Sequence, residues 1–223
     1  MIGFFMPVMR DDSARTILKQ LDGQGIDSFQ VIDNSGTFTF PCDLHYKELV
    51  LTSPRNNIGT NAAWNYAFDS KADYIGLVGD DYEVPPNLIS LFLEAFEKYP
   101  TAGAITATIV NQLPLNEFNP GFISGKRITG KGNMGVVLFR GEILRQIPKI
   151  PPEFFIFCGD NWIGYWLSKM ASPLILVNVF VGHVHKTDLK DKIGYKGIIV
   201  KEKSIYREWK AGERTLGGFD YTL

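Results

Sequence analysis

The sequence predicts an α/β fold with a mostly parallel sheet, because short apolar runs alternate with helix-length segments through its first half. The chain has 223 residues, of which 45% are hydrophobic and 21% are charged, as in an ordinary soluble globular domain. Its formal charge of −1 excludes a general electrostatic attraction to nucleic acid or to membranes. Strands that alternate with such helices form βαβ units, which bind ligands at the carboxyl ends of their strands.

The first half of the chain contains four apolar runs of strand length, separated by segments with helical spacing. The first helix is expected over residues 14–21, where apolar residues recur on one helical face and Ser13 is a suitable N-cap. A second helix is expected to begin near Gly59 and to end at about Phe68. The remaining elements predicted here are strands at 2–8, 28–32, 48–52 and 74–78 and a helix at 87–99.

The second half is less regular. Residues 111–131 are polar and rich in Gly, Pro and Asn, which predicts an excursion over the surface. Residues 186–214 carry an excess of about four positive charges, interleaved with aromatic residues, and predict a C-terminal appendage. The regular elements expected in this half are strands at 103–110, 133–139 and 174–181 and a helix at 160–170. We therefore predict one domain over residues 1–187, followed by an appendage over 188–223.

The cysteine content and the absence of long apolar runs indicate the compartment. Cys42 and Cys158 are too few for a disulfide framework, and their spacing is not that of a zinc motif. No apolar run approaches the roughly 18 residues that span a bilayer. The apolar N-terminus lacks a basic leader and predicts a buried strand rather than a signal peptide. We expect a soluble, cytoplasmic protein.

Acidic residues follow two of the predicted strands. Asp80 and Asp81 come directly after the 74–78 strand, where side chains project toward the crevice above the sheet. A hard cation such as Mg²⁺ or Mn²⁺ takes one or two carboxylates together with phosphate oxygens. A solvated turn is an equally reasonable interpretation of the pair alone. Asp33 also ends a predicted strand and, in a parallel sheet, would face the same edge, where its carboxylate can accept hydrogen bonds from a base or a ribose.

Further candidate residues lie at helix starts and after the last strand. Gly59, in the segment that begins at Asn57, would let the backbone approach a ligand, although this pattern also fits a simple helix N-terminus. Asp160 is a candidate at the start of a predicted helix, and an N-cap is the alternative interpretation of it. His183 and His185 project to the same side of an extended chain, which adds some support for a metal site, although a histidine after a strand is usually a satisfied, partly buried residue.

Taken in order, these segments resemble glycosyltransferase family 2, whose members have the GT-A fold. The family pattern runs from a proline after the first strand, through a di-acidic metal motif, to an aromatic segment with an acid and a late histidine. The matching segments are Pro7, 33–35, Asn57 with Gly59 and Asn65, Asp80–Asp81 with Pro85, 132–140, 154–162 and 183–185. They extend over residues 1–187, and the order of seven weak elements makes the resemblance specific.

The resemblance implies a role for each matching residue. A nucleotide-binding half (1–100) and an acceptor half (101–187) are expected. Asp81, with His183 or His185, would ligate Mn²⁺ or Mg²⁺, and Asp160 would be the catalytic base. The residues implied to bind the nucleotide sugar are Pro7, Asp33 (at the base), Asn57, Gly59, Asn65 and Asp80 (at the ribose or the metal).

The implied activity is metal-dependent, inverting transfer of one sugar from a nucleotide-diphosphate sugar to an acceptor hydroxyl. The acceptor would be a glycan, a small molecule, a protein or a modified nucleic acid. The chain lacks the Gln-x-x-Arg-Trp motif of processive synthases, so single transfer is expected. It departs from the family pattern at Met9-Arg10, where Tyr-Asn is common, and at Gly159 and Trp166, which replace an acid and an arginine.

Two alternatives remain at this stage. A sugar-phosphate nucleotidyltransferase would need a glycine-rich loop bearing Arg or Lys directly after the first strand, and the segment after Pro7 has no glycines. A catalytically inactive nucleotide-sugar-binding module would keep the fold without the chemistry. The presence of both Asp81 and Asp160 argues against it.

Overall fold

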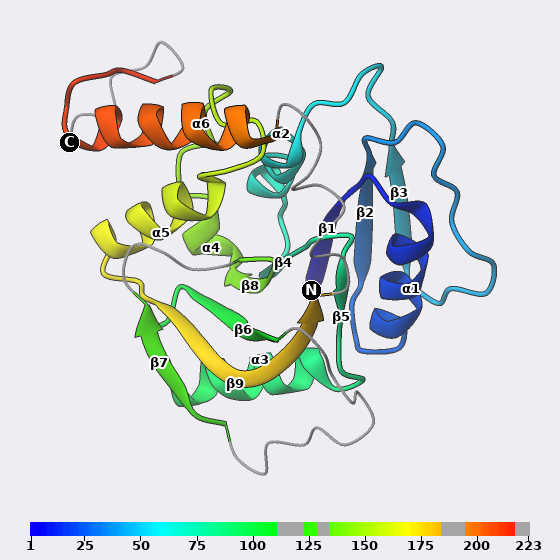
Figure 1. Ribbon diagram of the computed structural model, residues 1–223. Coiled ribbons are helices and arrows are strands. Elements are labelled where there is room, and N and C mark those ends of the chain that lie inside the picture. The colour runs from blue at the N-terminus through cyan, green and yellow to red at the C-terminus, as the bar shows by residue number, and fades with distance from the viewer. Residues whose placement is uncertain (111–122, 129–133, 184–194, 217–223) are drawn as a thin grey trace.

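A mixed sheet forms the centre of the protein (Figure 1). The computed structural model describes residues 1–110, 123–128, 134–183 and 195–216. In the described chain the strand order is β3-β2-β1-β4-β8-β6-β9-β5, and β7 pairs with β9. The strands are β1 (Ile2–Val8), β2 (Ser28–Asp33), β3 (Glu48–Thr52), β4 (Tyr74–Val78), β5 (Tyr82–Glu83), β6 (Ala104–Val110), β7 (Gly125–Ile128), β8 (Val136–Arg140) and β9 (Leu174–His183).

The N-terminal part of the sheet is parallel. β1 pairs with β2 on one side and with β4 on the other, and β2 pairs with β3. All seven residues of β1 are buried, which explains its unbroken apolar sequence, since a central parallel strand is covered on both faces. The next strand, β8, runs antiparallel to β4 and β6, whereas β6 and β9 are parallel. The carboxyl ends of β1, β2 and β4 therefore meet at one edge.

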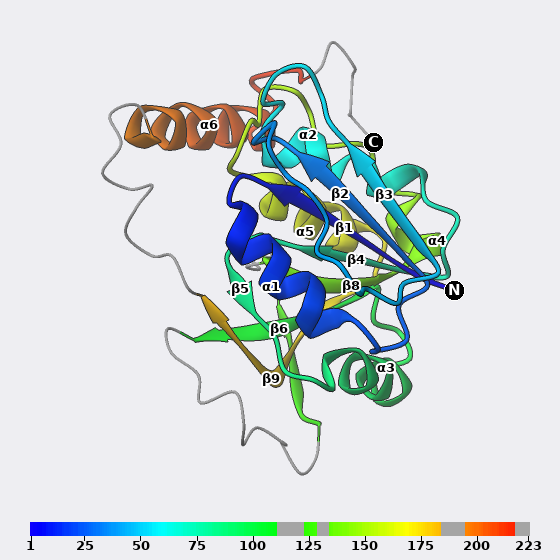
Figure 2. The same ribbon diagram turned by 90° about the vertical axis from the view of Figure 1, so that its right-hand side faces the viewer.

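Helices cover both faces of the sheet, and each face has its own core (Figure 2). α1 (Asp11–Leu21) and α3 (Leu88–Lys98) supply buried residues to the first core. The helices packed on the second core are α2 (Thr60–Trp64), α4 (Gly141–Leu144), α5 (Gly159–Lys169) and α6 (Tyr195–Lys210). This layered α/β arrangement confirms the predicted fold class.

The described part of the predicted appendage packs against the domain. Ile205 of α6 is buried in the second core, as is Leu216 beyond the helix. The ring of Trp209 lies 4.6 Å from that of Trp162 on α5, between centroids. The aromatic residues interleaved with the basic ones thus attach α6 to α5. No helix in the described ranges is both long and apolar enough to cross a membrane.

Several element boundaries differ from the predicted ones. α1 begins at Asp11, three residues before the expected start, and its N-cap is Arg10 rather than Ser13. The expected second helix is split into α2 and a 3-10 turn, Ala67–Asp69. β7 lies within the segment predicted as a surface excursion. Two of its four residues are exposed, so it lacks the apolar run by which a buried strand is recognised.

Two glycines provide opposite tests of this packing. A Cβ on Gly76 in β4 would lie 2.3 Å from ring atoms of the fully buried Phe4, so Gly76→Ala is expected to destabilise the protein by about 1–3 kcal/mol. A Cβ on Gly197 in α6 would meet nothing within 4 Å. Gly197→Ala is therefore expected to stabilise the helix by up to about 1 kcal/mol. Denaturant unfolding measures both, and equal effects of the two would contradict the packing described.

Candidate active site

A cavity of about 830 Å³ opens where β1 and β4 end. Seven of the residues predicted for the site line it, and they come from both halves of the chain. These are Pro7, Asn57, Gly59, Asp80, Asp81, Asp160 and His183. The other lining residues are Met9, Arg10, Asn34, Thr60, Trp64, Gly79, Tyr82, Met134, Gly135, Phe155, Ile156 and Phe157.

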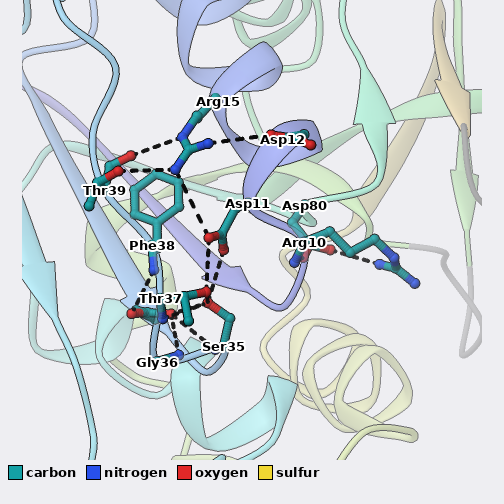
Figure 3. A network of polar contacts seen from close by, with 11 residues as sticks. Arg10, Asp11, Asp12, Arg15, Ser35, Gly36, Thr37, Phe38, Thr39 and Asp80 are labelled. Carbon is teal, nitrogen blue, oxygen red and sulfur yellow. Dashed lines mark hydrogen bonds and ion pairs between the residues drawn. The ribbon is translucent and has the colours of Figure 1, made fainter.

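Asp80 joins the end of β4 to the end of β1. Its Oδ2 accepts hydrogen bonds from the backbone N–H groups of Met9 (2.6 Å) and Arg10 (2.7 Å). Its Oδ1 accepts one from Nη1 of Arg10 at 3.0 Å, as Figure 3 shows. Asp80 is buried, and this burial raises the pKa of its carboxyl above the ordinary value, against the opposing effect of these donors.

Asp81 faces His183 across a strand pair. β5 pairs with β9 so that Tyr82 lies opposite His183, and this register brings the imidazole to the preceding carboxylate. Nε2 of His183 lies 3.0 Å from Oδ2 of Asp81. Nη1 of Arg10 is 3.7 Å from the same oxygen. A short β5 that the sequence pattern did not reveal thus brings two of the three predicted metal ligands together.

The donor set of Asp81 and His183 suits a divalent cation that keeps part of its coordination for water and phosphate. Mg²⁺ and Mn²⁺ commonly bind through one or two carboxylates plus substrate phosphates, and imidazole is a suitable ligand for transition metals. In the described ranges no three His, Cys, Asp or Glu side chains form a complete metal site. His185 lies outside the described residues. The protein therefore offers two converging donors, and a phosphate ligand would have to complete the sphere.

The loop before α2 approaches the far wall of the cavity closely. Gly59 has φ +83°, and a Cβ there would lie 2.3 Å from the carbonyl oxygen of Phe155. Only glycine fits this combination of left-handed backbone and close approach. Asn57 accepts a hydrogen bond from the Gly59 N–H at 2.8 Å, which fixes the loop in the cavity wall.

Asp160 lies in the first turn of α5 and lines the same cavity as Asp81. It belongs to the predicted acceptor half of the chain, whereas Asp81 belongs to the predicted nucleotide-binding half. The N-cap is Cys158, so Asp160 is not the simple cap that the sequence left open. Its Oδ1 accepts a hydrogen bond from the Asn161 N–H at 2.8 Å. Burial raises the pKa of the carboxyl, more than this hydrogen bond lowers it. A carboxylate so placed is a good proton acceptor for a bound hydroxyl.

Two predicted residues do not line the cavity. Asp33 is buried, and its carboxylate accepts hydrogen bonds from the backbone N–H groups of Ser35, Gly36 and Phe38. Burial raises its pKa, but these bonds and that of the Ser35 hydroxyl outweigh burial and leave the pKa low. Asn65 instead exchanges two hydrogen bonds with the backbone of Ile150. Both side chains stabilise loops in this structure, and their contact with a nucleotide stays a prediction.

The loop that Asp33 shapes is also attached to the start of α1. The Thr37 hydroxyl donates to Oδ2 of Asp11 at 2.9 Å, and the oxygen of the Ser35 hydroxyl lies 2.9 Å from Oδ1 of the same carboxylate (Figure 3). The guanidinium of Arg15 binds Thr39 through the backbone and the side chain. These contacts hold the loop after β2 beside the loop after β1.

Other lining residues were not predicted as site residues. The sequence distinguishes Arg10 only as a departure from the family pattern. Its Nη2 is buried and has no hydrogen-bond partner among the described residues, and the same is true of Nε1 of Trp64 in α2. Asn34 lies directly after Asp33 and binds the backbone of Ile58 and Gly59. The two unpartnered donors are available to a ligand that carries acceptor oxygens.

The family can now be assigned. The sequence profile described as "Glycosyl transferase family 2" matches residues 43–164, which is more than half of the chain. The chain belongs to this family. The matched range contains Asp81 and Asp160, two carboxylates that line the cavity. No curated protein sequence matches the chain.

Solved structures of GT-A glycosyltransferases share the fold of this family member. A crystal structure of GalNAc-T7 with UDP, GalNAc and Mn²⁺ aligns with a TM-score of 0.62 and 13% identity, over 96% of this chain and 50% of that one. S. aureus TarS 1-349 aligns with a TM-score of 0.56 and 13% identity, over 82% of this chain and 60% of that one. This chain thus spans only about half to three fifths of those chains.

The partly buried carboxyl of Asp160 has a consequence for stability. Its pKa is raised in the folded protein, so above that pKa folding must partly desolvate an ionised group. Asp160→Asn is expected to raise the thermal midpoint at pH 7. The gain should shrink as the pH falls through the raised pKa toward the ordinary value of 3.8, since the wild-type carboxyl is then protonated as well.

Thermal unfolding between pH 3.5 and pH 8 measures this gain. Asp43→Asn is the matched control, because Asp43 is exposed and its φ of +67° suits Asn as well as Asp. An Asp160→Asn protein less stable than wild type at pH 7 would contradict the predicted burial cost.

Proposed function

We propose that this protein transfers one sugar from a nucleotide-diphosphate sugar to an acceptor hydroxyl, with inversion at the anomeric carbon and with Mn²⁺ or Mg²⁺ as cofactor. The observation that carries the proposal is that Asp81, His183 and Asp160 line one cavity in a chain of glycosyltransferase family 2. The cavity lies at the carboxyl ends of parallel strands, where α/β sheets bind nucleotides. Its volume lies in the range of small-molecule sites.

The charges of the cavity support a cation requirement. The described lining residues include three carboxylates but only one guanidinium, that of Arg10. A diphosphate entering such a site would meet net repulsion unless a further cation accompanied it. Asp81 and His183 would hold this cation, which when bound would stabilise the negative charge of the leaving diphosphate. Arg10 already rests on Asp80 and Asp81, and its unpartnered Nη2 would donate to a phosphate oxygen.

Asp160 would act on the acceptor side. A sugar hydroxyl has a pKa far above 7, so it needs a base as it attacks. The hydroxyl oxygen would form a bond to the anomeric carbon while the bond from that carbon to the diphosphate oxygen breaks, and the hydroxyl proton would move to Asp160. The electron pair of the broken bond leaves with the nucleoside diphosphate. Attack from the face opposite the leaving group gives inversion in a single displacement.

The nucleotidyltransferase alternative is weakened by the loop after β1. Binding a triphosphate there requires backbone N–H groups that are free to contact phosphate oxygens. The N–H groups of Met9 and Arg10 both donate to Asp80 instead. The geometry thus favours a site in which this loop is braced and the diphosphate contacts side chains.

Binding of nucleoside diphosphates tests the donor half of the proposal. UDP, GDP and dTDP are screened by thermal shift with and without Mn²⁺, and the best ligand is then titrated by calorimetry. We expect one of them to bind in a Mn²⁺-dependent manner, and Asp81→Ala to weaken that binding by at least about tenfold, since it removes a charged ligand. Asp69→Ala, at an exposed carboxylate, is the control. Equal Mn²⁺-dependent affinity in wild type and Asp81→Ala would exclude Asp81 as a ligand.

Turnover tests the base. Sugar conjugates of the nucleoside diphosphate found in the screen are supplied as donors, and transfer to water is followed as donor hydrolysis. Asp160→Asn is expected to lower the rate by about 10²–10⁴-fold while the diphosphate still binds within about twofold of wild type. The wild-type rate should fall as the pH drops through the raised pKa of Asp160, because only the ionised carboxylate accepts a proton. An unchanged rate in Asp160→Asn would refute its role as base.

A further inference from the structure

One wall of the cavity has no regular secondary structure of its own. Phe155, Ile156 and Phe157 line the cavity and belong to neither a helix nor a strand. They lie directly before α5, so their position determines where Asp160 enters the site. Their backbone N–H and C=O groups need partners outside the segment, because no ladder or helix supplies them.

The partner of the N–H groups is a single carboxylate on α6. Oε1 of Glu202 accepts hydrogen bonds from the N–H groups of Phe155 (3.0 Å) and Ile156 (3.2 Å). Oε2 accepts one from Phe157 at 2.6 Å and a longer one from Ile156 at 3.4 Å. Glu202 is only 2% exposed, although it belongs to a helix with many charged residues. Three successive backbone donors thus converge on one buried anion.

The carbonyl groups of the same segment are held from the opposite side by α2. Nδ2 of Asn61 donates to the carbonyl oxygens of Phe154 (3.0 Å) and Phe157 (2.8 Å). The backbone N–H of Asn61 donates to the carbonyl oxygen of Phe155 at 3.3 Å. A Cβ on Gly159 would lie 2.0 Å from Oδ1 of Asn61, so there is no room for a side chain between Gly159 and α2. The wall is therefore fixed between α2 and α6.

We propose that Glu202 is a positioning residue, through which the C-terminal helix α6 holds the 155–157 wall and so sets the place of Asp160 in the cavity. Its effect on turnover rests on the proposed function, whereas the clamp itself does not. An ionised side chain is a costly way to fill a buried space, and apolar residues of similar size commonly serve stability as well or better. Burial raises the pKa of Glu202 in spite of its backbone donors, in keeping with that cost. What a carboxylate adds is two acceptor oxygens in a fixed plane.

The substitution Glu202→Gln removes one of these acceptors. An amide has one acceptor oxygen, and its NH₂ group would point donors at the remaining backbone donors. We expect amide hydrogen exchange at residues 155–157 to become about tenfold faster or more, from the loss of charge-assisted bonds. We expect kcat of donor hydrolysis to fall by about tenfold, while the affinity for the nucleoside diphosphate stays within about twofold.

Glu208→Gln is the matched control. It removes the same charge from the same helix at a residue that binds Ser204 and Arg214 rather than the wall. Unchanged exchange at 155–157 in Glu202→Gln would overturn the clamp. Faster exchange with wild-type kcat would reduce Glu202 to a structural residue and overturn the positioning role. Failure of the unchanged protein to bind any nucleoside diphosphate would instead overturn the proposed function, and the exchange comparison would still decide the clamp.

Should Glu202→Gln fail to fold, the unchanged protein supplies the decisive measurement. Its amides at 155–157 are expected to exchange at least about 100-fold more slowly than those of an unstructured peptide, although they lie outside regular structure. Exchange at the peptide rate would overturn the clamp. The Glu202→Asp variant keeps the carboxylate on a side chain that is one methylene shorter, which moves it away from the wall. It should give partial protection of the 155–157 amides from exchange and an intermediate kcat.

Discussion

The bonds from the Asp80 carboxylate to the loop after β1 are the contact on which the rest of the cavity depends. Two backbone N–H groups and one guanidinium converge on this side chain. They fix the ends of β1 and β4 relative to each other beyond the point where strand pairing between them stops, at Phe5 and Leu77. Because the loop after β1 is held in this way, Asp81 lies against His183, and the guanidinium of Arg10 lies beside Asp80 and Asp81.

The two walls of the cavity are built on different principles. The β1–β4 wall is the edge of a parallel sheet, whose strands are aligned by regular pairing and by buried apolar side chains. The opposite wall is an irregular segment that is held by side chains from helices distant in sequence, Asn61 and Glu202.

The sequence predicted the features that depend on local pattern. Apolar runs located seven of the strands, and the acids after β4 were expected at a sheet edge because every parallel strand ends there. It did not predict that the side chains of Asp33 and Asn65 would form hydrogen bonds with loop backbone. The partner of Asn65 could not be foreseen, because it is the backbone of Ile150, 85 residues away. Glu202 had no visible signal at all. Among the lysines of α6 it looked like one more solvated charge, because its partners are backbone N–H groups that leave no mark in a sequence.

Burial disfavours the ionised form of three carboxyl groups in and beside this site. Burial raises the pKa of Asp80, Asp160 and Glu202 alike, so each would be easier to accommodate as a neutral side chain. Asp80 and Glu202 recover part of the cost from several backbone donors, whereas Asp160 has only the N–H groups of its own helix start. A carboxylate that is partly buried, has few hydrogen-bond donors and lines a cavity does not favour stability. It suits the proposed role of a base, in which the missing partner would be the hydroxyl whose proton it takes.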